Sequence, residues 1–248
     1  MSPAQRCNFD HSNFATILRF YTMFPSSTVE NYLKAIHQGQ STLPDGQRLV
    51  PMGSVALALG VTPGTATTMV KTLAESGLVE YEPYSGVRLS TAGDRLAALV
   101  LRRHRLVELF LVQVMGMSWA EVHEEAEKLE HVVSERLIER IDDMLGRPTR
   151  DPHGDPIPDP DGAVAAVNPD SLLTCPIATP LRVMRVADQD PSFLHFVEQN
   201  GLKPGQPVEV DMRDPAADAV LVRGKDRRPI TIGARAASKL LVEIDRPG

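Results

Sequence analysis

One short stretch of the sequence contains residues that could bind a metal ion. The segment HEEAEKLEH, residues 123–131, holds two imidazoles and four carboxylates in nine positions. On a helix, His123, Glu127, Glu130 and His131 fall within one sector about 100° wide, beside the apolar stripe of the same helix. These four side chains are therefore candidate metal ligands that flank a buried face.

A second pair of candidate ligands precedes this stretch. His104 and Glu108 are four residues apart, so on a helix they share one face. If the two helices pack as an antiparallel pair, imidazoles and carboxylates meet from both sides. Carboxylate oxygens mixed with imidazole suit Mn(II) or Fe(II), although Zn(II), Co(II) and Ni(II) also bind such a set. The alternative is a solvated charged face with histidines satisfied in the core, and Glu124 and Glu125 fit that reading best.

No motif of a known class of enzyme accompanies these residues. The sequence contains neither H-E-x-x-H nor H-x-x-E-H, and it lacks a G-x-S-x-G elbow, a P-loop and a G-x-G-x-x-G fingerprint. A catalytic metal also needs an open coordination position and a general base, and nothing singles out such a base. The sequence favours a protein that is not an enzyme, with a metalloenzyme as the less favoured alternative.

Composition indicates a globular cytoplasmic protein with no membrane segment. Of 248 residues, 42% are hydrophobic and 23% charged, the net charge is −6, and no apolar run reaches the length of a membrane span. Two distant cysteines, Cys7 and Cys175, suit a reducing compartment better than a disulfide framework. The net charge argues against indiscriminate nucleic-acid binding but leaves room for a local basic face.

Residues 26–96 show the element order of a winged helix-turn-helix. A first helix is followed by a short helix ending near Gly60, and then by a helix with Thr62 as N-cap and Pro63 in its first turn. After Gly77, the segments LVEYEP and VRLS predict two strands joined through Ser85-Gly86. Helix, helix-turn-helix and hairpin in this order are typical of a DNA-binding module.

Short hydroxyl side chains dominate the exposed face of the second helix of this motif. Hydroxyls allow close approach to base edges, and their methyl groups can meet thymine. Lys71 suits a phosphate and Arg88 a contact from the hairpin. The candidate DNA contacts are Thr28, Thr62, Thr65, Thr67, Thr68, Lys71 and Arg88. Because few of them are positive, dimerisation would be needed to raise the affinity, and the alternative is a winged helix that binds protein.

The remaining chain divides into a helical and a strand-rich part. Residues 91–145 have a helical pattern broken near GMSW, and residues 146–171 are rich in Pro, Asp and Gly, as in a linker or extended arm. Short apolar runs then alternate with turns, which predicts a small barrel of about five strands with one helix at SFLHFVEQNG.

The expected fold is mainly α with a small β part. It comprises an N-terminal winged helix-turn-helix, a helical dimerisation domain and a C-terminal SH3-like β-barrel. The expected segments are an extension of unknown role at 1–25, in which Met23 is a second candidate start, the DNA-binding domain at 26–96, the metal-binding and dimerisation domain at 97–148, the linker at 149–171 and the SH3-like domain at 172–247.

Several segments carry a resemblance to a known family. From about Ser26 to Pro158 the chain resembles the metal-dependent repressors of the diphtheria toxin repressor and manganese transport regulator type. The part from 172 to 245 looks like the SH3-like domain that many members carry. The matching segments are TVENYLKAI, VTPGTATTMVKTLAESGLVEYEPYSGVRLS, RRHRLVELFL, EVHEEAEKLEHVVSERL, GRPTRDPHGDPIP and NGLKPGQPVEV.

The resemblance implies two metal sites per subunit. His104, Glu108 and His123 match the ancillary site, whereas Glu127, Glu130 and His131 match the primary site. In the family the first helix completes the primary site, at a position that matches Asn31.

Two residues depart from the pattern of the family at this first helix. A Met or Asp is usual where Asn31 stands, and Lys34 replaces a Glu of the manganese type. Asn31 still offers a carbonyl oxygen, whereas a protonated Lys34 cannot ligate and would oppose a second cation. Asp190 is the candidate by position for a ligand from the C-terminal domain.

The expected function is that of a metal-activated transcriptional repressor. A cytoplasmic homodimer would bind Fe(II) or Mn(II), with two ions per subunit, and then bind double-stranded operator DNA of metal-homeostasis genes. The alternatives are a metal-sensing winged-helix protein without direct operator binding and the metalloenzyme named above.

Overall fold

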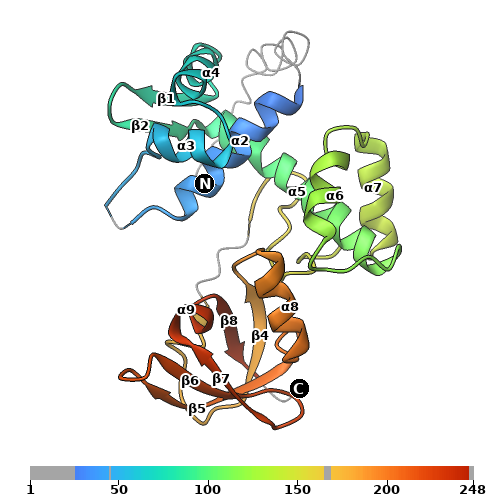
Figure 1. Cartoon of the computed structure of the whole chain (residues 1–248). Helices are drawn as coiled ribbons and strands as arrows, with labels where there is room; N and C mark the ends of the chain where they lie inside the picture. Colours follow the sequence, from blue (N-terminus) through green and yellow to red (C-terminus); the bar gives the residue numbers. More distant parts are fainter. Residues whose placement is uncertain (1–25, 45, 165–168, 246–248) are drawn as a thin grey trace, which may run out of the picture. The chain divides into compact units, whose positions relative to one another are not determined.

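The structure of the chain, a computed structural model, describes residues 26–44, 46–164 and 169–245. The expected N-terminal extension and Met23 lie outside the described residues. The chain divides into two units, Met1–Val100 and Leu101–Gly248. Figure 1 shows helices in the first unit and, in the second, helices followed by a sheet.

The described residues of the first unit form four helices, the last of which continues into the second unit, and a two-stranded hairpin. In chain order these are α2 (Ser26–Ser41), α3 (Met52–Ala58), α4 (Pro63–Glu75), β1 (Val79–Glu82), β2 (Gly86–Leu89) and α5 (Thr91–Gln113). Their core is built around Leu33, Ile36, Val70 and Leu73, all at most 1% exposed. The predicted element order of the winged helix-turn-helix is therefore present.

Helix α4 begins as its sequence predicts. The side chain of Thr62 accepts a hydrogen bond from the backbone N–H of Thr65, and Pro63 occupies the first turn, where a missing N–H costs nothing. The helix buries Ala66, Val70 and Leu73 and leaves its threonine-rich face accessible.

The turn of the hairpin ends one residue earlier than expected, at Ser85 instead of Gly86. Strands β1 and β2 pair antiparallel from Val79↔Leu89 to Glu82↔Gly86, so the turn consists of residues 83–85 and Gly86 already belongs to β2. Tyr84 at the tip has a left-handed backbone (φ 66°). Val50 and Val87 exchange backbone hydrogen bonds in an isolated antiparallel bridge, which ties the chain before α3 to the wing.

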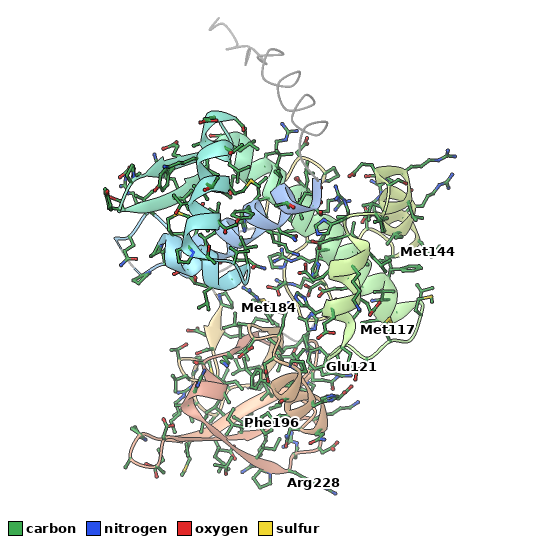
Figure 2. All side chains as sticks on the ribbon, turned by 45° about the horizontal axis from the view of Figure 1, so that its top comes forward. Met117, Glu121, Met144, Met184, Phe196 and Arg228 are labelled. Atoms are coloured by element: carbon green, nitrogen blue, oxygen red, sulfur yellow. The ribbon has the colours of Figure 1, made fainter. Side chains whose placement is uncertain are left out.

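The helical part of the second unit has one more break than the periodicity predicts. Helix α5 is followed by α6 (Val122–Leu129) and α7 (Glu135–Met144), with Met117 and Glu121 in the connection before α6 (Figure 2). The second break follows from Ser134, whose side chain accepts a hydrogen bond from the backbone N–H of Leu137 and starts a new helix. The expectation that the helical pattern of residues 91–145 breaks only near GMSW was therefore wrong.

The strand-rich part forms a six-stranded antiparallel sheet in the order β3-β8-β4-β5-β6-β7. Its strands are β3 (Asp170–Ser171), β4 (Leu181–Val186), β5 (Pro207–Asp214), β6 (Ala219–Arg223), β7 (Pro229–Gly233) and β8 (Leu240–Ile244), with helices α8 (Pro191–Gln199) and α9 (Ala234–Ala237) between them. The described order is open, with β3 and β7 at its edges, where a closed barrel was expected.

The core of this sheet extends beyond the strands. Leu194 and Val197 of α8 pack into it together with Trp119 and Ala120, which come from the connection between α5 and α6. In the described part of the chain, no helix combines the length and the apolar character needed to cross a bilayer.

Candidate metal centre

The centre is built on two residues of α5 that lie one helical turn apart. His104 is 4% exposed and Glu108 is fully buried, and Nε2 of His104 lies 3.0 Å from Oε1 of Glu108. His123 of α6 approaches the same pair, with its Nδ1 3.1 Å from both Nε2 of His104 and Oε1 of Glu108. We call His104, Glu108 and His123 the His123 cluster. These are the residues that the family resemblance assigns to the ancillary site.

The other nitrogen of His104 faces a second group. Its Nδ1 lies 2.5 Å from Oε2 of Glu130, which is fully buried, and 3.9 Å from Oε1 of Glu127. We call His104, Glu127 and Glu130 the Glu130 cluster. His131 stands beside it, with Nε2 3.4 Å from Oε1 of Glu130. The structure thus brings together the three residues predicted for the primary site and adds His104 to them.

A third group was missed by the sequence analysis. Asp151, His153 and Glu108 are all buried, and one ligand atom from each lies within 4.8 Å of the others. We call them the His153 cluster. Asp151 and His153 belong to the Asp-Pro-His-Gly segment at 151–154, which composition alone suggested was part of a linker. A histidine two residues from an aspartate within an otherwise flexible composition was the signal that could have revealed them.

The segment that carries Asp151 and His153 is a tight, ordered loop. Oδ1 of Asp151 accepts hydrogen bonds from the backbone N–H groups of His153 and Asp155, at 2.8 and 2.9 Å. Gly154 has φ +87°, and a Cβ there would collide with the backbone carbonyl of Met184. The backbone carbonyl of His153 accepts a hydrogen bond from Val186 of β4. The loop is therefore held against the sheet and presents the other oxygen of Asp151 inward.

Buried polar atoms without hydrogen-bond partners converge on the His153 cluster. They include Oε2 of Glu108, Oδ2 of Asp151 and Nδ1 of His153. Because Nε2 of His153 lies 2.8 Å from the backbone carbonyl of Trp119, which can only accept, Nε2 carries the proton. A metal-ligating histidine characteristically donates its second N–H in this way. Buried acceptors that face one another call for a shared cation, so the residues fit a metal ion.

Burial and the close approach of these side chains shift the pKa values of the residues in the His153 cluster. Burial alone would raise the pKa of Glu108, but the hydrogen bonds of its Oε1 with His104 and His123, together with the nearby imidazole of His153, hold that pKa well below its ordinary value. Burial and the charges of Asp155 and Glu108 raise the pKa of Asp151 to about 7. Burial opposes a charge on His153, yet the facing carboxylate of Glu108 and the charge of Asp151 raise its pKa overall.

Three arginines of α5 hold the surrounding segments in place. Arg103 donates to the backbone carbonyl of Glu130 at 3.0 Å, directly at a candidate ligand. Arg105 donates to the backbone carbonyl of Pro156, and Arg102 donates to that of Pro158 at 2.9 Å. Arginine forks of this kind fix the positions of α6 and of the 151–158 loop relative to His104 and Glu108.

The donor set is one of oxygen and imidazole without thiolate. Cys175 is buried in the core of the sheet, where Arg213 donates to its sulfur and to its carbonyl oxygen. Burial raises the pKa of the Cys175 thiol, which keeps it protonated. The set therefore suits Mn(II) or Fe(II) better than metals that prefer sulfur.

Three other residues considered at the sequence level lie apart from these clusters or in the other unit. Asp190 is exposed, and its carboxylate caps α8 by accepting the backbone N–H of Phe193. Asn31 belongs to α2 of the first unit, where its Oδ1 is buried and has no hydrogen-bond partner. Lys34 of the same helix is 6% exposed.

The candidate DNA contacts gather on α4 and the wing. Thr67 and Thr68 donate their hydroxyl protons to the backbone carbonyls of Pro63 and Gly64, so outward they offer methyl groups and acceptor lone pairs. Thr62 and Thr65 share a hydrogen bond of 2.9 Å, and Lys71 is exposed. Thr28 lies in the first turns of α2, half-buried.

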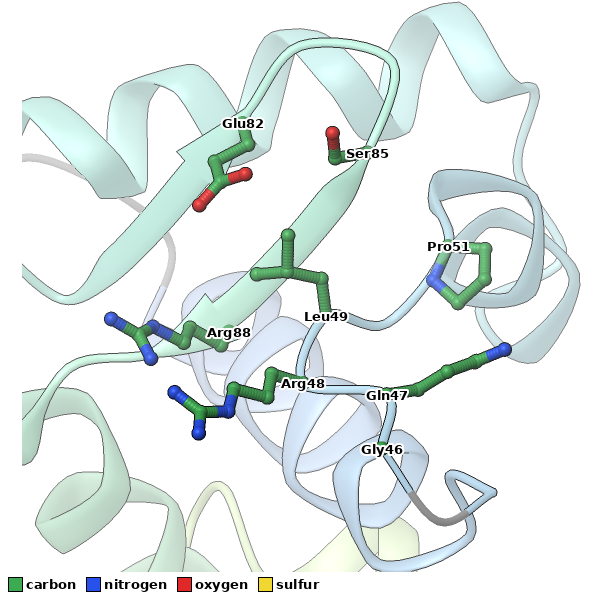
Figure 3. A pocket seen from close by; sticks show the side chains of 8 residues that line it. All are labelled: Gly46, Gln47, Arg48, Leu49, Pro51, Glu82, Ser85 and Arg88. Atoms are coloured by element: carbon green, nitrogen blue, oxygen red, sulfur yellow. The ribbon is translucent and has the colours of Figure 1, made fainter.

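Arg88 has a partner that the sequence did not indicate. It donates to the carboxylate of Glu80, its cross-strand neighbour, so part of its charge is offset. In Figure 3 its guanidinium lies beside that of Arg48, which is exposed. Both arginines line a pocket of about 560 Å³ together with Glu82 and Ser85. Arg48 is therefore a further source of positive charge at the base of the wing.

Comparison with protein families divides the chain into three matched regions. Residues 25–87 match the iron dependent repressor N-terminal DNA binding domain. Residues 90–159 match the iron dependent repressor metal binding and dimerisation domain, which contains all three clusters. Residues 171–244 match the FeoA domain.

Individual relatives agree with these matches. The iron-dependent repressor IdeR of Mycobacterium leprae is 29% identical over 79% of this chain and 88% of its own length. An HTH-type transcriptional regulator of Methanocaldococcus jannaschii is 34% identical over 47% of this chain and 90% of its own length. A solved structure of a manganese-dependent transcriptional repressor in complex with manganese is 38% identical, with a TM-score of 0.78 over 87% of this chain and 99% of that chain. The chain belongs to the iron-dependent repressor family, whose members are DNA-binding, metal-dependent transcriptional repressors and not enzymes.

Proposed function

We propose that the chain is a cytoplasmic, homodimeric repressor that binds operator DNA of metal-homeostasis genes when it is loaded with Mn(II) or Fe(II). The observation that carries this proposal is the set of buried atoms without hydrogen-bond partners in the His153 cluster, which lies in the domain that follows a DNA-binding module. A buried Glu-Asp-His set of this kind is costly unless a cation is shared among its members.

The proposal assigns two metal ions to each subunit. The first would be held by Glu127 and Glu130 with His104 and His131, and Asn31 stays a predicted further ligand. The second would be held by Glu108, Asp151 and His153. Each set mixes carboxylate with imidazole, and the bound cations would neutralise carboxylates that otherwise repel one another.

DNA recognition is assigned to the exposed face of α4 and to the wing. The methyl groups and acceptor oxygens of Thr67 and Thr68 suit thymine methyls and the exocyclic amino groups of adenine or cytosine. Lys71, Arg48 and Arg88 would contact phosphates and so contribute affinity without sequence preference. Two subunits would place two such helices on half-sites about one helical turn apart.

Metal-dependent retention of DNA tests the proposal. The full chain is titrated anaerobically with Mn(II), Fe(II) or Zn(II), and its mobility shift with promoter DNA is compared with that in chelator. Retention is expected with Mn(II) or Fe(II) and absent with chelator. Metal binding without DNA retention would support the alternative of a metal sensor that does not bind an operator directly, and would refute the proposal.

A ligand variant sharpens the test. Glu130→Ala should bind promoter DNA no better with metal than without it, while the chain remains a folded dimer by sedimentation and circular dichroism. A variant that responds fully to metal would show that Glu130 is not a ligand. Glu125→Ala is the matched control, because Glu125 lies on α6, which Glu130 caps, and pairs with Lys128 at the surface.

A further inference from the structure

The two nitrogens of one buried imidazole face two different sets of ligands. Nδ1 of His104 points to the carboxylates of the Glu130 cluster, and Nε2 points to Glu108 and His123. The ring is 4% exposed and makes an edge contact with His123 at a centroid distance of 4.8 Å. Its two nitrogens therefore keep their separate neighbours.

A neutral imidazole has one lone pair for a metal and one N–H to donate. If Nδ1 of His104 binds a metal with Glu127 and Glu130, its Nε2–H faces Oε1 of Glu108 at 3.0 Å and Nδ1 of His123 at 3.1 Å, and the charged carboxylate is the stronger acceptor. If Nε2 instead binds a metal with Glu108 and His123, Nδ1–H must point at Glu130. One neutral ring thus serves one of these two clusters at a time and orients the carboxylate of the other.

Glu108 links the protonation of His104 to the His153 cluster. Its Oε1 lies 3.0 Å from Nε2 of His104, whereas its Oε2 has no hydrogen-bond partner and lies 3.8 Å from Nδ1 of His153. An N–H donated by His104 to Oε1 would hold the carboxylate with Oε2 turned toward Asp151 and His153. The same N–H would leave no lone pair of His104 for a metal in the His123 cluster.

We propose, on the basis of the function proposed above, that His104 couples the two metal sites. A metal bound through Nδ1 fixes the Nε2–H on Glu108, favours a second metal at Glu108, Asp151 and His153, and excludes one from the His123 cluster. His104 is then a ligand of the first metal and a positioning residue for the second. The coupling is reciprocal, because each metal raises the affinity of the chain for the other by the same factor.

The inference is tested by counting and titrating Mn(II) on the full chain without DNA, by calorimetry and by electron paramagnetic resonance of the unbound ion. The wild type should bind two ions, and Asp151→Asn one. Glu127→Gln should weaken the second ion about 10-fold to 100-fold, the range typical when a residue that orients a ligand is lost. An unchanged second affinity in Glu127→Gln, which leaves every ligand of the second ion in place, would overturn the coupling.

Two further measurements separate coupling from structural damage. His123→Ala should still bind two ions, and binding of only one ion would mean that the His123 cluster is a genuine site. In chain labelled with ¹⁵N-histidine and loaded with Zn(II), the proton of His104 should reside on Nε2. A proton on Nδ1 with metal on Nε2 would refute the assignment.

These outcomes are distinct from failure of the proposed function. If the wild type retains promoter DNA only with metal but Glu127→Gln leaves the second affinity unchanged, the coupling is refuted and the function stands. If no metal affects DNA retention, the proposed function fails whatever the titrations show.

Discussion

The carboxylate of Glu108 faces the imidazole of His153 across 3.8 Å, and the two facing atoms, Oε2 and Nδ1, have no hydrogen-bond partner in the described structure. Both side chains are fully buried. Glu108 comes from the C-terminal half of α5 and His153 from a loop 45 positions later in the sequence, whose turn is held by Asp151. The two residues therefore join the helical part of the second unit to the loop that leads into its sheet.

Glu127 and Glu124 form a matched pair on α6. Glu127→Gln is expected to lower the affinity for the first metal by at least about 100-fold, because it removes a charged ligand beside His104. Glu124→Gln should leave that affinity unchanged, since Glu124 is exposed and belongs to none of the three clusters. Calorimetric titration with Mn(II) measures both. Equal losses in the two variants would point to a general charge effect and against a ligand role of Glu127.

Asp151→Asn is expected to flatten the pH dependence of stability of the metal-free chain. The pKa of Asp151 is raised from 3.8 to about 7, so the folded chain keeps a proton that the unfolded chain loses. The free energy of unfolding contributed by this group therefore falls as pH rises from about 4 to about 7, by at most about 4 kcal/mol. Urea unfolding at pH 5 and pH 8 in chelator measures the difference, and an equal loss in wild type and variant would contradict the expectation.

Gly154→Ala is expected to destabilise the chain by about 3 kcal/mol or more. The residue has φ +87°, and a Cβ would collide with the carbonyl of Met184. Gly205→Ala is the control, because Gly205 has φ +85° with open space around its Cβ position and should cost only about 1 kcal/mol. Thermal unfolding compares the two. Similar losses of stability in the two variants would mean that the 151–154 loop rearranges to accommodate the added methyl group.

Lys71→Ala should weaken binding to all DNA sequences alike. Loss of one phosphate contact per subunit should lower the slope of log affinity against log salt by about two for a dimer. Lys225→Ala, which removes an exposed lysine in the sheet region, should leave the slope unchanged. Fluorescence anisotropy with promoter DNA at several salt concentrations gives both slopes. An unaltered slope in Lys71→Ala would exclude Lys71 from the phosphate contacts.

Local signals explain why the first unit was predictable in detail. The N-cap role of Thr62 and the place of Pro63 depend on residues within one turn of each other, and the structure confirms both. The turn of the wing was less predictable, because Tyr84 adopts the left-handed conformation at its tip, whereas Gly86, whose φ is also positive, already belongs to β2. A non-glycine residue at such a position gives no compositional signal.

The metal centre was only partly predictable, for a different reason. His104, Glu108, His123 and Glu127 follow helical spacing and so appear in a periodicity analysis. Asp151 and His153 reach the same centre through a loop whose shape depends on long-range bonds, such as that of Arg105 to the carbonyl of Pro156. Periodicity carries no information about packing of that kind.

Trp119 gives the connection before α6 a second role. Its ring stacks on His153 at 5.3 Å between centroids, its backbone carbonyl accepts the proton of that histidine, and its side chain lies in the core of the C-terminal sheet. A chain shortened before Asp170 would leave this indole against water and deprive His153 of its neighbours on one side. The C-terminal sheet thus packs, through Trp119, against a residue of the metal centre. We therefore expect its removal to lower the affinity of the chain for metal.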